Sequence, residues 1–178
     1  MAQMSQMVSS RKLEVVIAVI VVILDQVTKA MVRPALALHE SREVIPGFLD
    51  LTRVHNTGAA FGMLNGVDFP FKTLALSLVA IVALSGVAWY AVTVPLSDRL
   101  ARIGIAAVLG GAIGNLIDRA SAGYVLDFVD AYWGGWHFWA FNVADAAITV
   151  GVVFMILDIL GLGKRLQERT SVNASNPV

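Results

Sequence analysis

Residues 73–94 read TLALSLVAIVALSGVAWYAVTV, and Pro95 ends the run. No charged side chain interrupts these residues. A helix needs about 20 consecutive apolar residues to cross the hydrocarbon core of a membrane. The stretch therefore predicts a transmembrane helix over about 73–94 and indicates a membrane protein.

Further apolar runs lie on either side of this one, over about 13–32, 100–117 and 141–160. The first follows Arg11 and Lys12, as in a secretory signal peptide. Polar residues 25–29 interrupt it, however, and no convincing small-residue cleavage site follows. The run at 100–117 is rich in glycine and alanine, which let membrane helices approach closely. We therefore expect a single all-α membrane domain over residues 1–178, with four transmembrane helices.

The composition supports the same class of protein. Hydrophobic residues make up 57% of the 178 residues and charged residues only 15%, whereas soluble domains average about 45–50% and about 25%. This balance argues against a water-soluble enzyme and rules out a disordered chain. Lys plus Arg equals Asp plus Glu at 13 each, so no net charge indicates nucleic acid as a partner. The lack of cysteine excludes a thiol nucleophile, a disulfide framework and thiolate metal sites.

Basic residues predict the orientation of the four helices, because they are enriched in cytoplasmic loops. Short segments on one side of the four-helix model contain Arg11, Lys12, Arg99, Arg102, Lys164, Arg165 and Arg169. We therefore place both termini in the cytoplasm, and we expect the polar tail over about 170–178 to be disordered. The periplasmic side then holds two longer segments, about 33–71 and 118–140.

The two periplasmic segments differ in character. Residues 43–55 alternate and include β-branched side chains, which predicts a small β-sheet at the membrane surface. The second segment forms an aromatic-rich loop that contains Tyr124, Tyr132, Trp133, Trp136 and Trp139. Such rings are typical of the headgroup layer, although contact with a substrate is the alternative interpretation.

Polar residues that a membrane helix should avoid gather near the periplasmic surface of this model. A carboxylate inside a membrane costs several kcal/mol and is a functional hypothesis by default. The cluster consists of Asp25, Asn56, Asn115, Asp118, Asp127, Asn142 and Asp145. Asn115 with Asp118, and Asn142 with Asp145, are spaced i, i+3 and so share a helical face.

Several of these residues also have a purely structural interpretation. Asp25 could form a neutralising i, i+4 pair with Lys29, Asn115 could bond a neighbouring helix, and Asn142 could cap the fourth helix. Asp118 with Arg119 could be an ordinary helix end. Asp145 is the hardest to explain structurally, because it lies in an apolar run without an adjacent base, and Asp127 also has apolar neighbours. Asp130 and Asp158 are typical of interfacial charges.

Two close carboxylates in a dry site cannot both ionise, so they share one proton. The ionised one can act as a base that activates water, while the protonated one polarises a carbonyl. This aspartic-peptidase chemistry needs no metal and no cofactor. His39, His55 and His137 lack metal-ligand spacing, but a hard-cation site built from Asp and Asn oxygens stays possible.

Five short stretches occur in order along the predicted helices: DQVTK at 25–29, NTGAAFG at 56–62, GGAIGNLIDR at 110–119, VLDF at 125–128 and FNVAD at 141–145. Together they resemble the signal peptidase II family, the lipoprotein signal peptidases of the bacterial inner membrane. The resemblance covers about residues 13–160. It implies a membrane-embedded aspartic endopeptidase that cleaves diacylglyceryl-modified prolipoproteins N-terminal to the lipid-modified cysteine.

The resemblance also assigns roles to residues. It places the catalytic pair at Asp127 and Asp145, with Asp118 as a rival for the first position. Substrate-binding or supporting roles fall to Asp25, Lys29, Asn56, Gly58, Asn115, Asp118, Arg119, Asn142 and Ala144. The expected partners are the prolipoprotein and membrane lipid, with no nucleic acid, and a monomer is expected. The active site would lie near the periplasmic face of the inner membrane.

Two other classes of protein fit parts of the sequence. A small transporter or proton channel would use intramembrane carboxylates to relay ions, but it predicts carboxylates at several depths, whereas these gather at one surface. A non-catalytic membrane scaffold gives no reason for Asp145 to lie in an apolar run.

Overall fold

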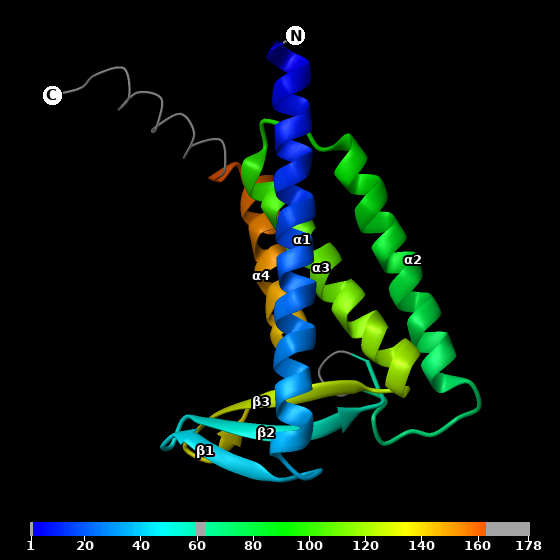
Figure 1. Cartoon of the computed structure of the whole chain (residues 1–178), viewed down its shortest axis with the longest axis vertical. Helices are drawn as coiled ribbons and strands as arrows, with labels where there is room; N and C mark the ends of the chain where they lie inside the picture. The colour runs from blue at the N-terminus through cyan, green and yellow to red at the C-terminus, as the bar shows by residue number, and fades with distance from the viewer. Residues whose placement is uncertain (1, 60–62, 163–178) are drawn as a thin grey trace, which may run out of the picture.

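The computed structural model describes residues 2–59 and 63–162, with side chains from Arg11 onward. The expected tail at 170–178 therefore lies outside the described residues. Within them the helices are α1 (Ala2–Ala35), α2 (Lys72–Thr93), α3 (Arg99–Ala122) and α4 (Val143–Ile159). The strands are β1 (Ser41–Ile45), β2 (Leu49–Asn56), β3 (Val125–Trp133) and β4 (Trp136–His137). The helices form a bundle with the sheet across one end (Figure 1).

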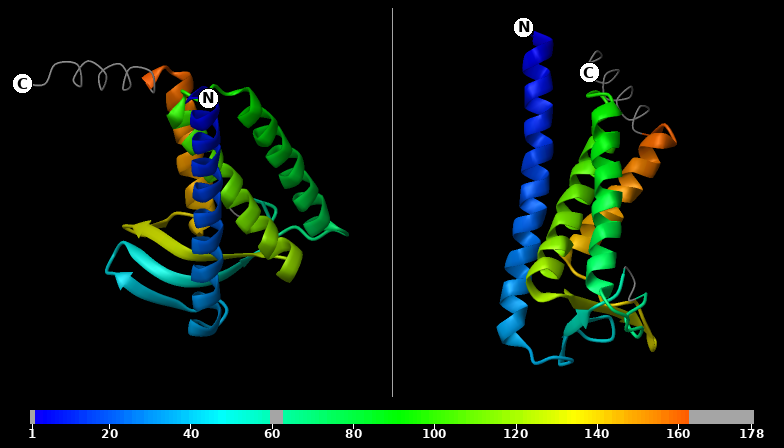
Figure 2. Two further views of the ribbon diagram at one scale, coloured as in Figure 1. Left: turned by 45° about the horizontal axis from the view of Figure 1, so that its top comes forward. Right: turned by 90° about the vertical axis from the view of Figure 1, so that its right-hand side faces the viewer.

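Helix α3 is the centre of the bundle, because it packs against α1, α2 and α4. Helix α2 lies to one side and rests on α3 (Figure 2). Small residues make the close contacts possible. A Cβ atom on Gly104 would lie 2.5 Å from the carbonyl oxygen of Gly151 in α4, and one on Gly110 would lie 2.7 Å from that of Ala18 in α1.

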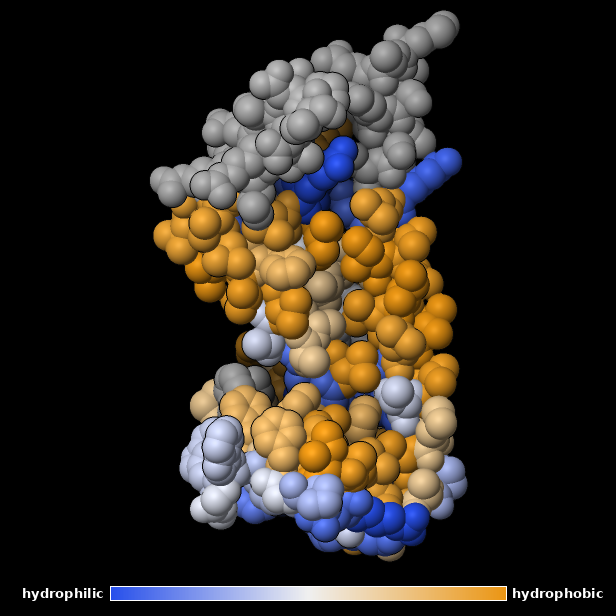
Figure 3. Space-filling view, turned by 90° about the vertical axis from the view of Figure 1, so that its left-hand side faces the viewer, coloured by the Kyte–Doolittle hydropathy of each residue, from blue (hydrophilic) through white to orange (hydrophobic). Residues whose placement is uncertain are grey.

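The outside of the bundle is strongly apolar. Val19 and Ile23 of α1, Val82 of α2 and Ile156 of α4 are each about half exposed or more. Figure 3 shows one face of the bundle, on which a broad hydrophobic band lies between hydrophilic residues at either end. Exposed apolar surface of this extent needs a lipid environment. Helices α1 (over Arg11–Ala35), α2 and α3 are long and apolar enough to cross a membrane, whereas α4 is shorter, at 17 residues.

The expected helix bounds need correction mainly at their polar ends. Helix α2 agrees with the expected 73–94 to within one residue. Helix α1 extends beyond the expected 13–32 at both ends, and α3 continues past the expected end at 117 to Ala122. Hydropathy falls at Asp118, but helical hydrogen bonding does not depend on hydropathy. It continues until Gly123, whose φ of 80° ends α3 and whose N–H donates to the Arg119 carbonyl.

The antiparallel sheet has the strand order β1-β2-β3-β4. The β-structure predicted at 43–55 is confirmed as β1 and β2. The prediction that 118–140 is an aromatic loop was wrong, because this segment contains the end of α3 and the β3–β4 hairpin. Hydropathy did not predict β3, because this strand is stabilised by pairing with β2, where Val54 lies opposite Asp127.

One face of the sheet covers the end of α1. Val32 and Leu36 of α1 form a buried cluster with Leu126 and Phe128 of β3. Side chains alternate between the two faces of a strand, so Asp127 points to the opposite face from Leu126 and Phe128. That face meets the first turn of α4.

Candidate active site

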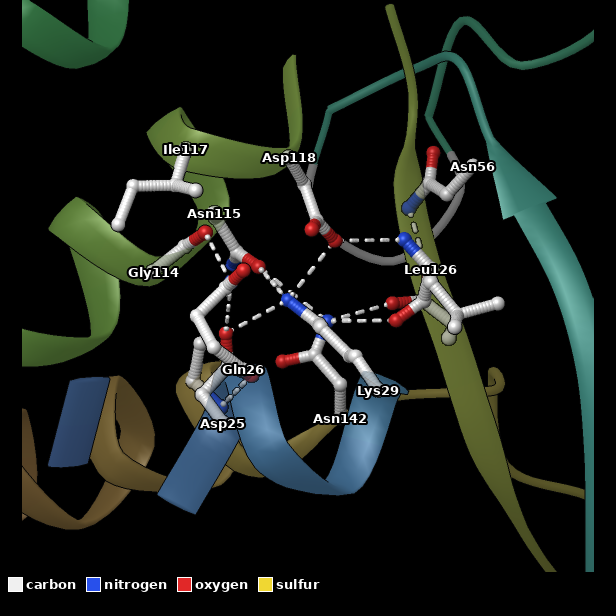
Figure 4. Close-up of polar contacts among 12 residues, drawn as sticks. Asp25, Gln26, Lys29, Asn56, Gly114, Asn115, Ile117, Asp118, Leu126 and Asn142 are labelled. Carbon is white, nitrogen blue, oxygen red and sulfur yellow. Dashed lines mark hydrogen bonds and ion pairs between the residues drawn. The ribbon is translucent and has the colours of Figure 1, made fainter. Parts of the chain in front are cut away.

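A buried polar cluster fills the junction between the helices and the sheet. Its side chains come from α1, α3, β2, β3 and the start of α4 (Figure 4). Asp25, Lys29, Asp118 and Asn142 are fully buried, and Asp127 is 2% exposed. The seven polar positions predicted to gather near one surface therefore do come together.

Asp127 lies on β3 between two amide donors. One carboxylate oxygen accepts a hydrogen bond from Asn142 Nδ2 at 2.7 Å, and the other accepts from Asn56 Nδ2 at 3.0 Å. Burial, followed by the negative charge of Asp145, raises the pKa of Asp127 from 3.8 to about 7, although both amides favour the charged form. Asp127 is thus poised to exchange a proton near neutral pH.

Asp145 lies in the first turn of α4, at the start of the apolar run over about 141–160. Its Oδ1 accepts a hydrogen bond from Asn115 Nδ2 at 2.8 Å. Asn142 is the N-cap of α4 and accepts from the Asp145 N–H at 3.0 Å, while Asp145 Oδ2 accepts from the Asn142 N–H at 3.4 Å. This reciprocal capping box fixes the carboxylate of Asp145 at the helix start.

Asn142 therefore joins the two aspartates. Its backbone and Oδ1 atom cap α4 around Asp145, and its Nδ2 atom donates to Asp127. The same Nδ2 atom also lies within bonding distance of Asn115 Oδ1, at 3.2 Å. The N-cap interpretation of Asn142 is confirmed, and the residue serves the site as well.

Lys29 connects α1 to α3 through three contacts. Its ammonium lies 2.8 Å from Asp25 Oδ2, 3.0 Å from Asp118 Oδ2 and 3.1 Å from Asn115 Oδ1. The i, i+4 pair predicted for Asp25 and Lys29 is confirmed, but it belongs to a larger network. Because both residues are fully buried, removing Lys29 would leave Asp25 without its counter-charge.

Two aspartates use their remaining atoms to position the catalytic candidates. Asp25 Oδ1 accepts from the Ala144 N–H at 3.1 Å, which joins α1 to the residue before Asp145. Asp118 Oδ2 accepts from the Leu126 N–H at 3.0 Å, which joins α3 to the residue before Asp127. Their contacts are those of supporting residues.

Glycine lets α3 come close enough for these contacts. A Cβ atom on Gly114 would lie 2.6 Å from Asp25 Oδ2, and one on Gly111 would lie 2.4 Å from the Ala144 carbonyl oxygen. Ala144 is itself completely buried. Any larger residue at these positions would push α1 or α4 away from the site.

Asn56, Gly58 and Arg119 form the β2 side of the site. Asn56 Oδ1 accepts from the Gly58 N–H at 2.9 Å, and Arg119 donates to the Gly58 carbonyl at 3.0 Å. A Cβ atom on Gly58 would lie 2.2 Å from the Met63 carbonyl oxygen. Gly58 is thus needed for the chain to fold tightly after Asn56.

Three contributors to the cluster were not singled out by sequence reasoning. Gln26 donates to Asp25 Oδ2 and to the Gly114 carbonyl, at 3.0 and 3.1 Å. Arg33 donates to Asp118 Oδ1 at 3.0 Å, and its i, i+4 spacing from Lys29 could have indicated it. The third contributor is the backbone N–H of Leu126, which donates to Asp118 Oδ2. Every residue except proline has such a group, so the sequence could not single it out.

The charges interpreted as interfacial lie away from the cluster. Asp130, farther along β3, pairs with His137 at 2.9 Å, and Asp158 lies near the opposite end of α4. In the described part of the chain, no three His, Asp or Glu side chains come together as metal ligands. The absence of a metal remains a prediction.

Comparison with known proteins identifies the family. Residues 17–161 match the family described as signal peptidase (SPase) II. Curated relatives named lipoprotein signal peptidase include those of Symbiobacterium thermophilum, 43% identical over 83% of this chain and 94% of the relative, and Syntrophotalea carbinolica, 47% identical over 79% and 86%. The relative from Bacillus pumilus is 36% identical over 88% of this chain and 97% of its own length.

A solved structure supports the same assignment. It is described as a bacterial membrane enzyme determined by the in meso method at 2.3 Å resolution. It superposes with a TM-score of 0.72 at 34% identity, covering 84% of this chain and 88% of the other. With the buried aspartate cluster and the apolar helices, these matches show that the chain belongs to the signal peptidase II family, a family of membrane aspartic peptidases.

Proposed function

We propose that this peptidase cleaves the signal peptide from diacylglyceryl-modified prolipoproteins, N-terminal to the lipid-modified cysteine, with Asp127 and Asp145 as the catalytic pair. One observation carries the assignment. Two aspartates from different elements meet at Asn142, and each is oriented by an asparagine side chain, Asn56 for Asp127 and Asn115 for Asp145.

The chemistry follows that of a carboxyl pair sharing one proton. The ionised carboxylate removes a proton from a water molecule, whose oxygen attacks the carbonyl carbon of the scissile bond. The protonated partner donates to the carbonyl oxygen, which gives a tetrahedral diol. The pair then passes its proton to the leaving nitrogen and takes one from a hydroxyl of the diol. The carbon–nitrogen bond breaks as the carboxylic acid product forms, and the pair is again in its single-proton state.

The charges of the cluster favour this single-proton state. Its carboxyl groups are Asp25, Asp118, Asp127 and Asp145, and its cations are Lys29, Arg33 and Arg119. Four negative and three positive charges leave one excess negative charge. One proton shared by Asp127 and Asp145 makes the buried cluster neutral, which is the least costly state in a dry site.

Asp118, the rival for the catalytic role, has no free oxygen. Its Oδ1 accepts from Arg33, and its Oδ2 lies between the Lys29 ammonium and the Leu126 N–H. Two cations and a backbone donor thus occupy both of its carboxylate oxygens. Asp118 therefore positions β3 and takes no part in proton transfer.

The membrane arrangement follows from the bundle and the substrate. Helix α4, with 17 residues, is about 26 Å long at 1.5 Å per residue, close to the hydrocarbon thickness of about 30 Å. We infer four spans in the bacterial inner membrane, both termini cytoplasmic, and the site near the periplasmic face. A substrate anchored by acyl chains meets the site at that depth.

Cysteine labelling tests this topology, because the chain has no native cysteine. Ser97, in the α2–α3 turn, is exposed and suits a cytoplasmic probe, and Glu43 on β1 is its exposed periplasmic counterpart. Arg102 would be a poor choice, since its guanidinium is paired with Glu14. An impermeant periplasmic reagent should label Glu43→Cys and spare Ser97→Cys; labelling in the reverse order would contradict the orientation.

The β3–β4 hairpin and the segment after α1 lie at the site end of the bundle. Trp133, Trp136 and Trp139 are 78%, 67% and 63% exposed, and exposed tryptophan favours the headgroup layer. We infer that these segments cover the substrate and contact lipid. We also infer that a monomer is sufficient for activity.

The decisive experiment is an activity assay on the purified protein. Signal-peptide release should occur with a prolipoprotein that carries diacylglyceryl-cysteine. The matched control is the same polypeptide with an unmodified cysteine, which should remain uncleaved. No cleavage of the lipidated substrate by folded protein, or equal cleavage of both, would contradict the proposed function.

A further inference from the structure

Lys72, the first residue of α2, is a buried cation beside the site. Its exposed fraction is 8%. The ammonium donates to the Val67 carbonyl at 2.7 Å, to Thr57 Oγ1 at 3.2 Å and to the Asn65 carbonyl at 3.4 Å. Three donors of one ammonium are thus matched to three neutral oxygens at separate points of the chain.

None of the ion pairs found within the described residues includes Lys72. A buried ammonium without a counter-ion is costly unless its hydrogen bonds are well made. Methionine or leucine would fill the same space without this cost. The positive charge is therefore explained by the three oxygens that its donors hold, one of which is Thr57 Oγ1.

Thr57 connects the ammonium to the catalytic candidates. Its N–H and hydroxyl both donate to Asn65 Oδ1 at 2.9 Å, so the hydroxyl oxygen is oriented to accept from Lys72. The preceding residue is Asn56, whose amide donates to Asp127 at 3.0 Å. One peptide unit therefore separates the contact with Lys72 from the contact with Asp127.

Packing does little to hold Thr57. A cavity of about 500 Å³ lies beside Lys72, with Thr57, Val67 and Phe71 among its lining residues. The start of α2 is itself anchored, because Thr73 Oγ1 donates to the Gly123 carbonyl, at the turn between α3 and β3, at 3.1 Å. Lys72 thus extends from a fixed helix end across a poorly filled space to Thr57.

We propose that Lys72 is a positioning residue of the peptidase, whose ammonium holds Thr57 so that Asn56 keeps its hydrogen bond to Asp127. The inference rests on the proposed catalytic role of Asp127. The Asn56 amide favours the charged form of Asp127. Loss of Lys72 should therefore raise the pKa of Asp127 and move the acid limb of the pH–rate profile to higher pH.

The test measures kcat and KM across pH for Lys72→Met on a diacylglyceryl-modified substrate. We expect kcat to fall by about 10- to 100-fold, since misplacing a catalytic group by about 1 Å costs about 100-fold. The acid limb should move upward, and Lys72→Arg should restore part of both. The matched control is Lys12→Met, because Lys12 is exposed on α1 and the substitution is the same.

A merely structural role for Lys72 predicts a different result, a loss that is equal at every pH with an unmoved acid limb. That result, or wild-type kinetics, would overturn the proposal. If Lys72→Met does not accumulate as folded protein, Thr57→Val removes the accepting hydroxyl and should move the limb in the same direction; an unmoved limb there overturns the proposal as well. An active Asp127→Asn would instead refute the catalytic pair itself.

Discussion

The sharpest test of the site replaces Asp145 by asparagine, which keeps the size of the side chain and removes its function as an acid or base. Proton transfer by a positioned group is worth about 10²- to 10⁴-fold in rate. At 1.36 kcal/mol per tenfold, this is about 2.7–5.4 kcal/mol of transition-state stabilisation. We therefore expect Asp145→Asn to lower kcat at least 100-fold.

The contacts of Asp145 predict a much smaller effect on folding. The oxygen that accepts from Asn115 at 2.8 Å can be kept as the amide oxygen of the new side chain. The lost acceptor is the one that meets the Asn142 N–H at 3.4 Å, a long bond. A single hydrogen bond contributes about 0.5–1.5 kcal/mol, so the variant should still fold and insert.

Asp158 provides a matched control on the same helix. It is 13 positions from Asp145, about 20 Å along α4 at 1.5 Å per residue, near the helix end opposite the cluster. The assay compares turnover of the purified parent with Asp145→Asn, Asp127→Asn and Asp158→Asn, alongside their thermal unfolding. Asp127→Asn should be as inactive as Asp145→Asn, and Asp158→Asn should stay within a few-fold of the parent.

Two results would refute this reasoning. Near-normal turnover by Asp145→Asn would show that the carboxylate is not catalytic. A loss in Asp158→Asn as deep as that in Asp127→Asn would show that the site and the orientation of α4 are misassigned.

Other predictions concern stability, packing and metal dependence. Burial raises the pKa of Asp127 from 3.8 to about 7, so the folded state binds an extra proton in this range. The parent should therefore lose stability as pH rises from about 4 to about 7. In thermal unfolding across pH, Asp127→Asn should lack this part of the dependence of Tm on pH, and an identical dependence would contradict the pKa shift. Gly114→Ala places a methyl group 2.6 Å from Asp25 Oδ2 and should lower both Tm and activity. In the matched control Gly86→Ala on α2, the methyl group meets nothing within 4 Å, so Tm and activity should stay unchanged or Tm should rise. Equal behaviour of the two variants would count against the tight α1–α3 contact. Cleavage should persist in EDTA, and a loss that Zn²⁺, Mg²⁺ or Ca²⁺ reverses would replace the carboxyl-pair mechanism by a metal-dependent one.

Local sequence was sufficient for the membrane class and for much of the site. Uninterrupted apolar residues located α2 to within one residue, because a hydrophobic run is a local property of the chain. The i, i+3 and i, i+4 spacings predicted which polar side chains share a helix face, and Lys29 indeed contacts Asp25. The resemblance to signal peptidase II then assigned the aspartates to roles that spacing alone left open.

Hydropathy was misleading where polar residues belong inside an element. Helix α3 runs on through Asp118, and Asp127 lies in a strand, although both were expected at or beyond the end of ordered spans. Asp145 has no adjacent base in the sequence, but its carboxylate takes part in the N-terminal capping box of α4. In each case partners from other elements satisfy the polar group, and a one-dimensional scale does not record such partners.

The membrane character and the identity of the polar residues were thus determined by sequence alone, since both depend on side-chain chemistry and near neighbours. Their assembly was decided by tertiary structure. Asn56 meets Asp127 across 71 positions, and the Ala144 N–H meets Asp25 across 119. These bonds form because glycines let α1 and α4 approach α3, and because β2 pairs with β3 in the register that places Val54 opposite Asp127. Such long-range contacts depend on how whole elements pack, and no local pattern in the chain encodes that geometry.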